Sequence, residues 1–505
     1  MNTLHFPWLE IAVVLPLVGA VVTHFTRNTD AAKKTAVVIA GFTLWATAAA
    51  WLDFYSLNAA VAQDSWDLID RFTSFDFLVI DELSAPLLPL TALIYVVTLL
   101  TTQRTKAQRF SFTWTLVSLS ITLATFGCRD PWCVISLLSL ATLLPYFELI
   151  RREKPTGVYV THMVAFIVLM IVGQGIVTLE GDIKVHSILA FIPLIVAVLI
   201  RSGAVPMHCW MTDLFEHATL GTSILFLTPM AGAYAALRLV VPIAPDWALR
   251  SIATVSLFTA IYAVGMALIQ KDTRRFFCYL MLSQSSLVLV GLEMTTPLGL
   301  TGALCVWLSI GLAMTGFGLI IRSLEARTGR LNLTDYHGLF DHVPSFAGFF
   351  LLMGLASVGF PGTIGFVSLE LLIEGAAQRG TVTGTVVVLA SALCGIAIMH
   401  AYFRIFTGKH HRTSISLKSS SSERFAYLVL IALIVIGGLV PQPGVATRYH
   451  AAVELLSHRN RELVEPIYRP VFVDGDIDDP AEPAEIELNR PTNSTNGTDD
   501  ENQSD

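Results

Sequence analysis

The chain has 505 residues, of which 54% are hydrophobic and only 14% are charged, with a mean hydropathy of +0.64. This composition excludes an ordinary soluble globular protein. The formal net charge of −7 comes from one end, because residues 474–505 hold eleven acidic residues against one arginine. That stretch alone contributes −10 and leaves about +3 for the rest; since it is polar and punctuated by proline, we expect a disordered tail.

Apolar runs of about 20 residues recur along the chain, the length that a helix needs to cross a bilayer. The sequence therefore predicts an all-α polytopic membrane protein with about fourteen transmembrane helices. The first run has no basic segment before it and no small-residue cleavage site, so we expect a retained span and not a signal peptide. The predicted spans are 8–26, 34–53, 83–102, 110–127, 131–150, 158–179, 186–209, 218–241, 248–270, 275–294, 297–322, 346–376, 382–406 and 425–443.

Basic residues gather in six connections, which all fall on one side of a fourteen-span protein. They follow spans one (Arg27, Lys33, Lys34), three (Arg104, Lys106, Arg109), five (Arg151, Arg152, Lys154), nine (Lys271, Arg274, Arg275), eleven (Arg322, Arg327, Arg330) and thirteen (Lys409, Arg412). The opposite connections are poor in Lys and Arg and often acidic, as in Asp64, Asp67, Asp70 and Asp76. The positive-inside rule then places both termini outside the cytoplasm.

Span seven is interrupted by SGAVP (202–206), which follows an apolar run that ends at Arg201. A proline in a helix interior removes a hydrogen bond and clashes with the preceding turn. With Gly203 and Pro206 so close, the helix is expected to break, and broken backbone at membrane depth requires burial in protein or a wet cavity. An arginine beside such a break is costly in hydrocarbon and marks a functional site. We interpret this stretch as the centre of an ion-translocating protein.

Span twelve carries a similar interruption, SVGFP (357–361), in which Gly359 and Pro361 take the corresponding places. Each string has a serine four residues before its proline, and the two spans lie five apart. Two glycine- and proline-interrupted spans in corresponding halves indicate an inverted-repeat transporter core.

The sequence contains no pattern typical of a cofactor site. The six cysteines are scattered without a CxxC pair or a His/Cys ligand set, and no GxGxxG is followed by an acidic residue. Cys128 and Cys133 bracket one short loop; they would form a disulfide only if that loop faces an oxidising compartment, and free thiols are the favoured interpretation. We expect no cofactor and no metal site in this chain.

From about residue 81 to residue 409 the chain resembles the antiporter-like membrane subunits of respiratory complex I and of the Mrp cation/proton antiporters. The stretches that carry the resemblance are DELSAPLLPLTALI (81–94), VPMHCWMTDLFEHA (205–218), YAALRL (234–239), QKDTRRFFCYLMLSQSSLVLVGL (270–292) and GFPGTIGFV (359–367). The resemblance implies fourteen helices in two symmetry-related halves, two discontinuous helices and a chain of buried charges. In the family, a Glu on the fifth helix pairs with a Lys on the seventh, and further Lys or Glu residues on the eighth and twelfth complete a proton relay.

This chain departs from that pattern in its first half. Arg201 stands where the family has its lysine, and a guanidinium holds a carboxylate or an anion but is a poor proton carrier. The alternative is an arginine that reaches a lipid headgroup. Leu140 occupies the position of the family glutamate, while Glu148 lies about two turns later. Glu148 is either a displaced partner of Arg201 or an interfacial residue paired with Arg151 or Arg152.

His208 resembles the family histidine of the VPLHxW pattern and can titrate near neutral pH. Asp213, Glu216 and His217 would then lie at the mouth of one half-channel. The alternative is a polar connection in which Asp213 caps the next helix. A metal site from His208, Asp213 and His217 matches no established spacing.

The second half has few titratable groups. In span eight, Pro229 and Met230 replace the expected lysine, which interrupts the relay. In span twelve the family residue falls on Leu369, next to Glu370; Glu370 and Glu374 share one helical face and are either a buried pair or a solvated end of the helix.

Span thirteen carries His400, with Arg404 one turn later. We treat His400 as the candidate titratable centre of this half, and the alternative is a histidine hydrogen-bonded to a neighbouring helix. The residues from Lys271 to Arg275 resemble the family's QTDIKR loop and are interpreted as anchors.

These features favour a membrane subunit that translocates protons or cations and couples their flow to a partner complex. Two settings remain open: an assembly of the complex I or Mrp type, and the membrane subunit of a DAB-type inorganic-carbon uptake system. A non-conducting docking subunit is the alternative, because the relay has lost residues. The predicted pathway residues are Glu148, Arg201, His208, His217, Glu370 and His400.

We expect partners among other membrane or peripheral subunits and no nucleic acid, with any oxidoreductase activity in those other subunits. The bacterial cytoplasmic membrane is the predicted location. Residues 1–80 would hold the first two helices and an acidic loop, 81–410 the conducting core, 411–445 the final helix and 446–505 an extramembrane tail.

Overall fold

The computed structural model describes residues 2–66, 77–103, 110–181, 186–292, 294–408 and 419–463. The acidic loop residues Asp67, Asp70 and Asp76 lie outside the described residues, as does the acidic tail from residue 474. The basic connections after spans three and thirteen lie outside them too, with Arg104, Lys106, Arg109, Lys409 and Arg412.

Within the described chain, ten helices are long and apolar enough to cross a membrane, and four shorter apolar helices accompany them. Together they match the predicted spans one for one, so the all-α polytopic fold is confirmed. The helices are α1 (Trp8–Phe25), α2 (Thr29–Ser56), α4 (Leu87–Leu100), α6 (Phe112–Phe126), α7 (Pro131–Arg151), α8 (Gly157–Glu180), α9 (Ile188–Ser202), α10 (Cys209–His217), α11 (Leu220–Leu227), α12 (Ala231–Ala235), the π-helix η1 (Ala236–Val240), α13 (Asp246–Ile269), α14 (Thr273–Leu292), α15 (Pro297–Thr328), the 3-10 helix η2 (Leu339–Asp341), α16 (Pro344–Ser357), α17 (Ile364–Arg379), α18 (Thr381–Phe406), α19 (Ser421–Leu439) and α20 (Gln442–Leu463).

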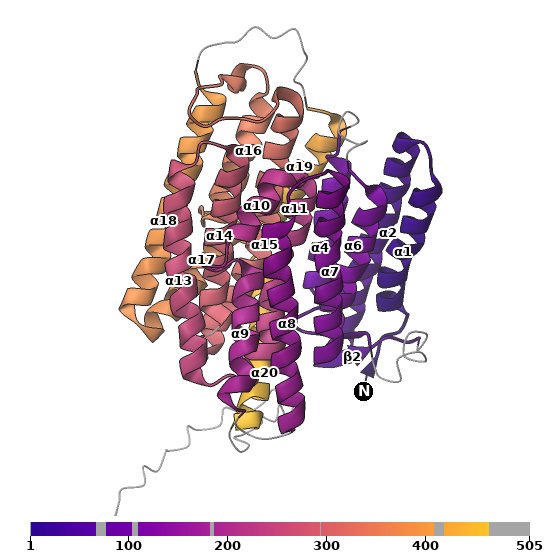
Figure 1. Cartoon of the computed structure of the whole chain (residues 1–505), viewed down its shortest axis with the longest axis vertical. Helices are drawn as coiled ribbons and strands as arrows, with labels where there is room; N and C mark the ends of the chain where they lie inside the picture. The colour runs from indigo at the N-terminus through magenta and orange to yellow at the C-terminus, as the bar shows by residue number, and fades with distance from the viewer. Residues whose placement is uncertain are drawn as a thin grey trace, which may run out of the picture. The chain divides into compact units, whose positions relative to one another are not determined.

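Three spans form the interior of the bundle. The stretch Leu220–Val240, α14 and α15 are each 94% buried over their most apolar part, whereas the other long helices are only 28–44% buried. Figure 1 shows α14 and α15 in the middle, with α1 and α2 on one flank and α13 and α18 on the other. A helix that is apolar all round belongs in the interior, and the outer helices leave apolar faces for the bilayer to cover.

A small sheet fixes the N-terminal segment. Strand β1 (Asn2–Thr3) pairs in parallel with β2 (Val61–Gln63), which pairs antiparallel with β3 (Val79–Asp81). Just after β3, Arg448 of α20 donates a hydrogen bond to the carbonyl of Leu83 at 3.1 Å. Strand β1 and helix α20 therefore lie at the same end of the bundle (Figure 1), as an even number of crossings requires.

The predicted break of span seven is confirmed. Helix α9 ends at Ser202 because Gly203 adopts φ +73°, a left-handed conformation that is cheap for glycine and strained for other residues. The chain then turns through Pro206, and α10 begins only at Cys209. Two half-helices thus replace one continuous span.

Neighbouring side chains pair the polar backbone groups that this break frees. The indole N–H of Trp210 donates to the carbonyl of Ile200 at 2.8 Å, and the N–H of Val205 donates to the hydroxyl of Thr259 at 3.0 Å. Helix α13, which carries Thr259, therefore supports the break from outside. This pairing is what broken backbone inside a membrane protein requires.

The predicted break of span twelve, near Pro361, is also confirmed, between α16 and α17. Gly359 adopts φ +82°, and a Cβ on Gly365 would lie 1.9 Å from the carbonyl oxygen of Ala356. Only glycine allows the half-helices to approach this closely. The first break has Arg201 five residues before its proline, and the second has Ala356 there, so the two halves differ in charge.

Span eight is divided as well, although the sequence predicted one continuous helix. Helix α11 ends at Leu227, and Met230 adopts φ +55° before α12 begins. Pro229 has no N–H, and the N–H of Met230 bonds to the carbonyl of Leu227 at 3.0 Å. The carbonyl of Phe226 is left available for a donor from elsewhere.

Candidate functional site

Arg201 lies at the C-terminal end of α11, where the carbonyl of Phe226 is free to accept a hydrogen bond. Its Nη2 atom donates to the carbonyl oxygen of Phe226 at 3.3 Å, and its guanidinium carbon lies 4.0 Å from the centre of the Phe226 ring and 5.9 Å from that of Trp210. The side chain is 3% exposed. A cation at the C-terminal end of a helix and over an aromatic face is favourable. These contacts therefore hold Arg201 at the C-terminal end of α11.

No described carboxylate forms an ion pair with Arg201, and its Nε atom has no hydrogen-bond partner among the described residues. A cavity of about 30 Å³ lies beside it, bordered also by Met230 and Ser285. That volume suffices for a water molecule. The headgroup interpretation of Arg201 does not fit, because the guanidinium lies inside the bundle.

Glu148 lies at the other end of α11. Its Oε1 atom accepts the N–H of Thr219 at 2.6 Å and faces Arg152 Nη1 at 3.4 Å, and its Oε2 atom accepts the hydroxyl of Thr222. Of the two interpretations left open by the sequence, the structure forms the pair with Arg152. The carboxylate also caps the N-terminus of α11, where negative charge is stabilising.

Helix α11 therefore carries an anion at its first turn and a cation at its last. Both charges oppose the partial charges of the helix ends, so each is stabilised by the helix dipole. The helix has eight residues, which separates the two charges by about 12 Å of helix axis. At that separation the two charges interact with each other by Coulomb's law across the helix.

A pocket of about 460 Å³ lies between α6, α7 and α11, and Glu148 is part of its wall. Basic residues line it at the end of α7, namely Arg151, Arg152 and Lys154. Its walls include Glu148, Thr222 and Phe226, the ring that carries the guanidinium of Arg201. The pocket thus leads past Glu148 to the aromatic contact of Arg201.

The histidines of the first half are placed differently from each other. His208 is nearly buried between the rings of Tyr262 and Tyr279, at centroid distances of 5.4 and 6.0 Å, and its Nδ1 atom has no partner among the described residues. His217 Nδ1 lies 3.1 Å from Asp213 Oδ1 on the same helix. The capping interpretation of Asp213 is wrong, because the hydroxyl of Thr219 accepts the N–H at the start of α11.

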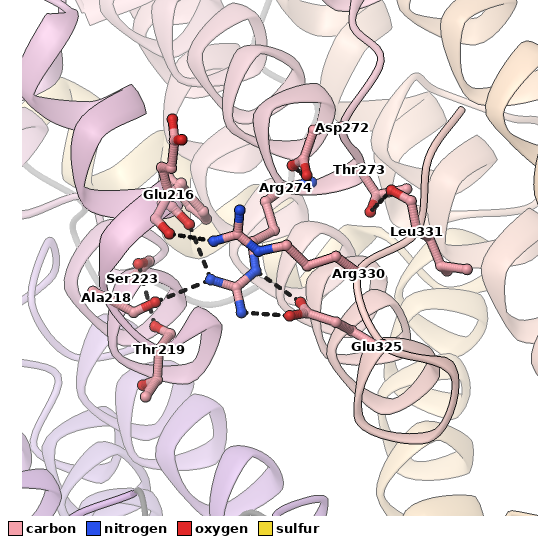
Figure 2. A network of polar contacts seen from close by, with 12 residues as sticks. Glu216, Ala218, Thr219, Ser223, Asp272, Thr273, Arg274, Glu325, Arg330 and Leu331 are labelled. Carbon is pink, nitrogen blue, oxygen red and sulfur yellow. Dashed lines mark hydrogen bonds and ion pairs between the residues drawn. The ribbon is translucent and has the colours of Figure 1, made fainter. Parts of the chain in front are cut away.

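The anchor interpretation of the segment from Lys271 to Arg275 agrees with the geometry. Arg274 forms a two-bond ion pair with Glu325, at 2.5 and 2.8 Å, and donates to the carbonyl of Ala218 at 3.1 Å. Arg275 pairs with Glu216. Figure 2 shows the guanidinium of Arg330 pointing at the same segment, where it donates to the carbonyl of Glu216 at 2.6 Å. These arginines fasten the C-terminal end of α10, where cations are favourable.

In the second half, Glu370 and Glu374 lie on the exposed face of α17. They do not form a buried pair, and they do not end the helix, which continues to Arg379. His400 lies near the end of α18, and its Nε2 atom accepts a hydrogen bond from Arg404 Nε at 3.4 Å. The partner of His400 is therefore on its own helix.

One buried ion pair was not identified as a site from the sequence. Arg238 of η1 lies 2.7 Å from Asp81, and Arg129 lies 3.6 Å from the same carboxylate oxygen. Burial raises the pKa of Asp81, but Arg238 and Arg129 outweigh burial and hold the pKa below its usual value. Both partners lie in stretches that carry the family resemblance, DELS and YAALRL, which is the signal that could have paired them.

Close to this pair, burial raises the pKa of Glu454 on α20 to about 7, and the negative charge of Asp81 adds to the effect.

Three further observations bear on sequence predictions. Cys128 and Cys133 are free thiols, and Leu140, at the position of the family glutamate, is 45% exposed. Within the described residues, no group of three or more His, Cys, Asp and Glu side chains is placed to hold a metal ion.

The comparisons with known proteins agree with this architecture. A sequence profile described as NADH:quinone oxidoreductase/Mrp antiporter, transmembrane, matches residues 159–394. The chain is 24% identical over 514 residues to NAD(P)H-quinone oxidoreductase chain 4 of Synechococcus sp. (strain WH7803), which covers 92% of each protein. It is 29% identical over 269 residues to NADH-quinone oxidoreductase subunit M of Rickettsia prowazekii, covering 52% of this chain and 54% of the relative. The chain thus aligns with about half the length of the latter.

Two solved structures share the fold. A chain of respiratory complex I from Thermus thermophilus superposes with a TM-score of 0.74 at 19% identity, covering 89% of this chain and 99% of the other. A chain of the Mrp complex from Dietzia sp. DQ12-45-1b gives a TM-score of 0.74 at 18% identity, covering 90% and 99%.

Proposed function

We propose that this chain, a member of the NADH:quinone oxidoreductase/Mrp antiporter family, is a subunit that moves protons or monovalent cations across a membrane within a multi-subunit complex. The matched region 159–394 contains both helix breaks and the buried Arg201. Its relatives are named as subunits of quinone oxidoreductases, and its fold is that of subunits in complex I and Mrp assemblies.

One observation carries this proposal: an anion and a cation cap the two ends of α11, and a pocket leads past the anion toward the cation. Glu148 takes up a proton from the pocket and loses its charge at the first turn of α11. Because Arg201 stays charged, it responds to the altered field and biases neighbouring groups that can titrate.

Farther along the path, His208 accepts the proton on its unpartnered Nδ1 atom, which lies beyond the break of span seven. His217 belongs to the same side through Asp213. In the second half, His400 is the proposed titratable centre, and Glu370 faces outward, where another membrane subunit covers it. A carboxylate facing lipid would be costly.

The proposed location is the bacterial cytoplasmic membrane, with both termini on the non-cytoplasmic side. The basic connections support this orientation. The partner assembly is of the complex I or Mrp type, or a cation-driven inorganic-carbon uptake system, and oxidoreductase chemistry belongs to other subunits.

Proton flux in proteoliposomes tests the proposal. The protein is reconstituted with and without its partner subunits, a pH gradient is imposed, and a pH-sensitive dye follows the decay. Flux by the unchanged protein that is abolished in Arg201→Ala and in His400→Ala supports translocation. Matched controls are Arg424→Ala, at an exposed arginine that bonds to Ser419, and His24→Ala, at an exposed histidine near the end of α1.

A docking subunit without conduction is the second candidate. It is favoured by Pro229 and Met230, which end α11 where the family carries a lysine, and by the outward position of Leu140. Absence of flux in every assembly, with the complex intact, would establish this alternative and end the translocation proposal.

A further inference from the structure

A second pocket, of about 230 Å³, lies at the ends of α4, α7, α14 and α15 next to the start of α11. Among the described residues that line it are four arginines from different segments, with Glu325 as the one carboxylate. The arginines are Arg152, Arg274, Arg322 and Arg330. Such a lining has a strong excess of positive charge in a confined space.

Two of these charges are already neutralised. Arg274 forms its two-bond ion pair with Glu325, and Arg152 faces Glu148. The other two contact only uncharged acceptors among the described residues. Arg322 donates to the carbonyl of Thr98 and to the hydroxyl of Thr102, both at 3.1 Å, and Arg330 donates to the carbonyl of Glu216.

The position of Arg322 adds to this excess. Its guanidinium lies against the first turn of α11, because a Cβ on Gly221 would be 3.0 Å from its Cζ atom and 3.1 Å from its Nη2 atom. The Phe110 ring packs on it at 4.8 Å. The N-terminal end of a helix carries positive partial charge, and Glu148, which caps this end, is one carboxylate against the two arginines Arg152 and Arg322.

We propose that this pocket binds a phosphate-class oxyanion between Arg322 and Arg330, with Arg152 at its edge. The planar guanidinium forks of these side chains match tetrahedral oxyanions with two parallel hydrogen bonds. The start of α11 contributes the field of a helix N-terminus. The anion is either the headgroup of an anionic phospholipid or free inorganic phosphate, since both present the same oxygens. Binding is independent of proton flux and stands whether or not the subunit conducts.

The test uses the full-length protein in nanodiscs of phosphatidylcholine and measures its melting temperature and calorimetric binding. One series adds inorganic phosphate, and the other replaces part of the lipid with phosphatidylglycerol. Stabilisation by phosphate identifies a free ion, and stabilisation by phosphatidylglycerol alone identifies a headgroup; either result supports the site. Stabilisation by neither overturns it.

The variants localise the effect. Arg322→Gln and Arg330→Gln each weaken binding by roughly tenfold to a hundredfold, the loss of a charge-assisted hydrogen bond. Gly221→Ala weakens it without removing a charge, because the new methyl group displaces the Arg322 guanidinium. Arg424→Gln removes an exposed charge outside the pocket and leaves binding unchanged. Since Arg330 is exposed in a connection, its variant folds even where Arg322→Gln does not. Equal losses in Arg330→Gln and Arg424→Gln would mean that only surface charge matters, and would overturn the proposal.

Discussion

Glu148 and Arg201 occupy opposite ends of one eight-residue helix, α11, and are linked through that helix and not through an ion pair. Each charge is stabilised by the helix dipole at its own end of α11, and neutralising Glu148 also breaks its ion pair with Arg152.

Glu148→Gln separates the charge of this residue from its capping role. Glutamine still accepts the N–H of Thr219, so the melting temperature stays close to that of the unchanged protein. Proton flux falls roughly tenfold or more, because a positioned proton carrier has been removed. Glu148→Ala in addition loses the cap, which costs about 1 kcal/mol. Flux that survives in Glu148→Gln would remove Glu148 from the pathway.

Arg201→Ala leaves the carbonyl of Phe226 without its donor. We expect a loss of about 1–3 kcal/mol in unfolding free energy, the cost of a buried unpaired acceptor. Arg201→Lys keeps a cation that can release its proton when buried, so flux persists and becomes pH-dependent. Phe226→Leu is the control, since it removes the aromatic face and keeps the carbonyl. Flux in Arg201→Lys that is independent of pH would contradict the assigned role.

Asp81 and Arg238 form a buried pair that a double-mutant cycle can measure. Asp81→Asn leaves Arg238 without its carboxylate, which costs about 3–5 kcal/mol, whereas Arg238→Gln costs less because Arg129 still faces Asp81. The double variant costs much less than the sum of the two, because neither charge remains alone. Arg129→Gln is the comparison: its Nε lies 3.6 Å from Asp81 and its side chain is 29% exposed, so the loss is smaller. Additive losses in the double variant would show that the pair is not coupled.

The buried carboxyl group of Asp64 makes the stability of the protein depend on pH. It accepts the N–H of Glu10 at 2.7 Å, and burial raises its pKa to about 7 despite this bond. The folded state therefore holds a proton that the unfolded chain releases near pH 4. The stabilisation that comes from the raised pKa of Asp64 is complete below pH 4 and is lost as the pH rises toward 7. We expect a higher melting temperature at pH 4.5 than at pH 8.

Two variants isolate the groups responsible for this dependence. Asp64→Asn reduces the difference in melting temperature between pH 4.5 and pH 8. Glu454→Gln reduces the remaining difference, since the pKa of Glu454 is also raised to about 7. The two residues lie on different elements, so their effects should add. A difference that neither variant reduces would place its origin elsewhere in the protein.

The span pattern and two helix breaks could be predicted because they depend on local chemistry. The length of each apolar run determines whether it crosses the bilayer, and glycine with proline determines where a helix stops. The third break, at Pro229, could not be predicted in the same way. A single proline does not by itself end a helix, since Pro145 and Pro193 lie inside α7 and α9, and span eight has no glycine in the few residues before its proline.

The contacts of the site could be predicted only as alternatives. The choice of Glu148 between Arg201 and Arg152 depends on where α11 begins, and Thr219, 71 residues away, decides it. The ion pair of Asp81 with Arg238 likewise joins distant segments. Sequence spacing along one helix gives neighbours on that helix, whereas partners on other helices follow from packing.

The bond between Arg448 and Leu83 bears on how the protein is made. The two residues are 365 positions apart, and a ribosome adding about 5–20 residues per second needs roughly 20–70 s to cover that distance. During that time the carbonyl of Leu83, just before α4, lacks the guanidinium of Arg448 that later donates to it. The packing of α20 is then the last step of assembly at this end of the bundle. A chain that ends before Arg448 would insert its helices but would leave the carbonyl of Leu83 without this donor.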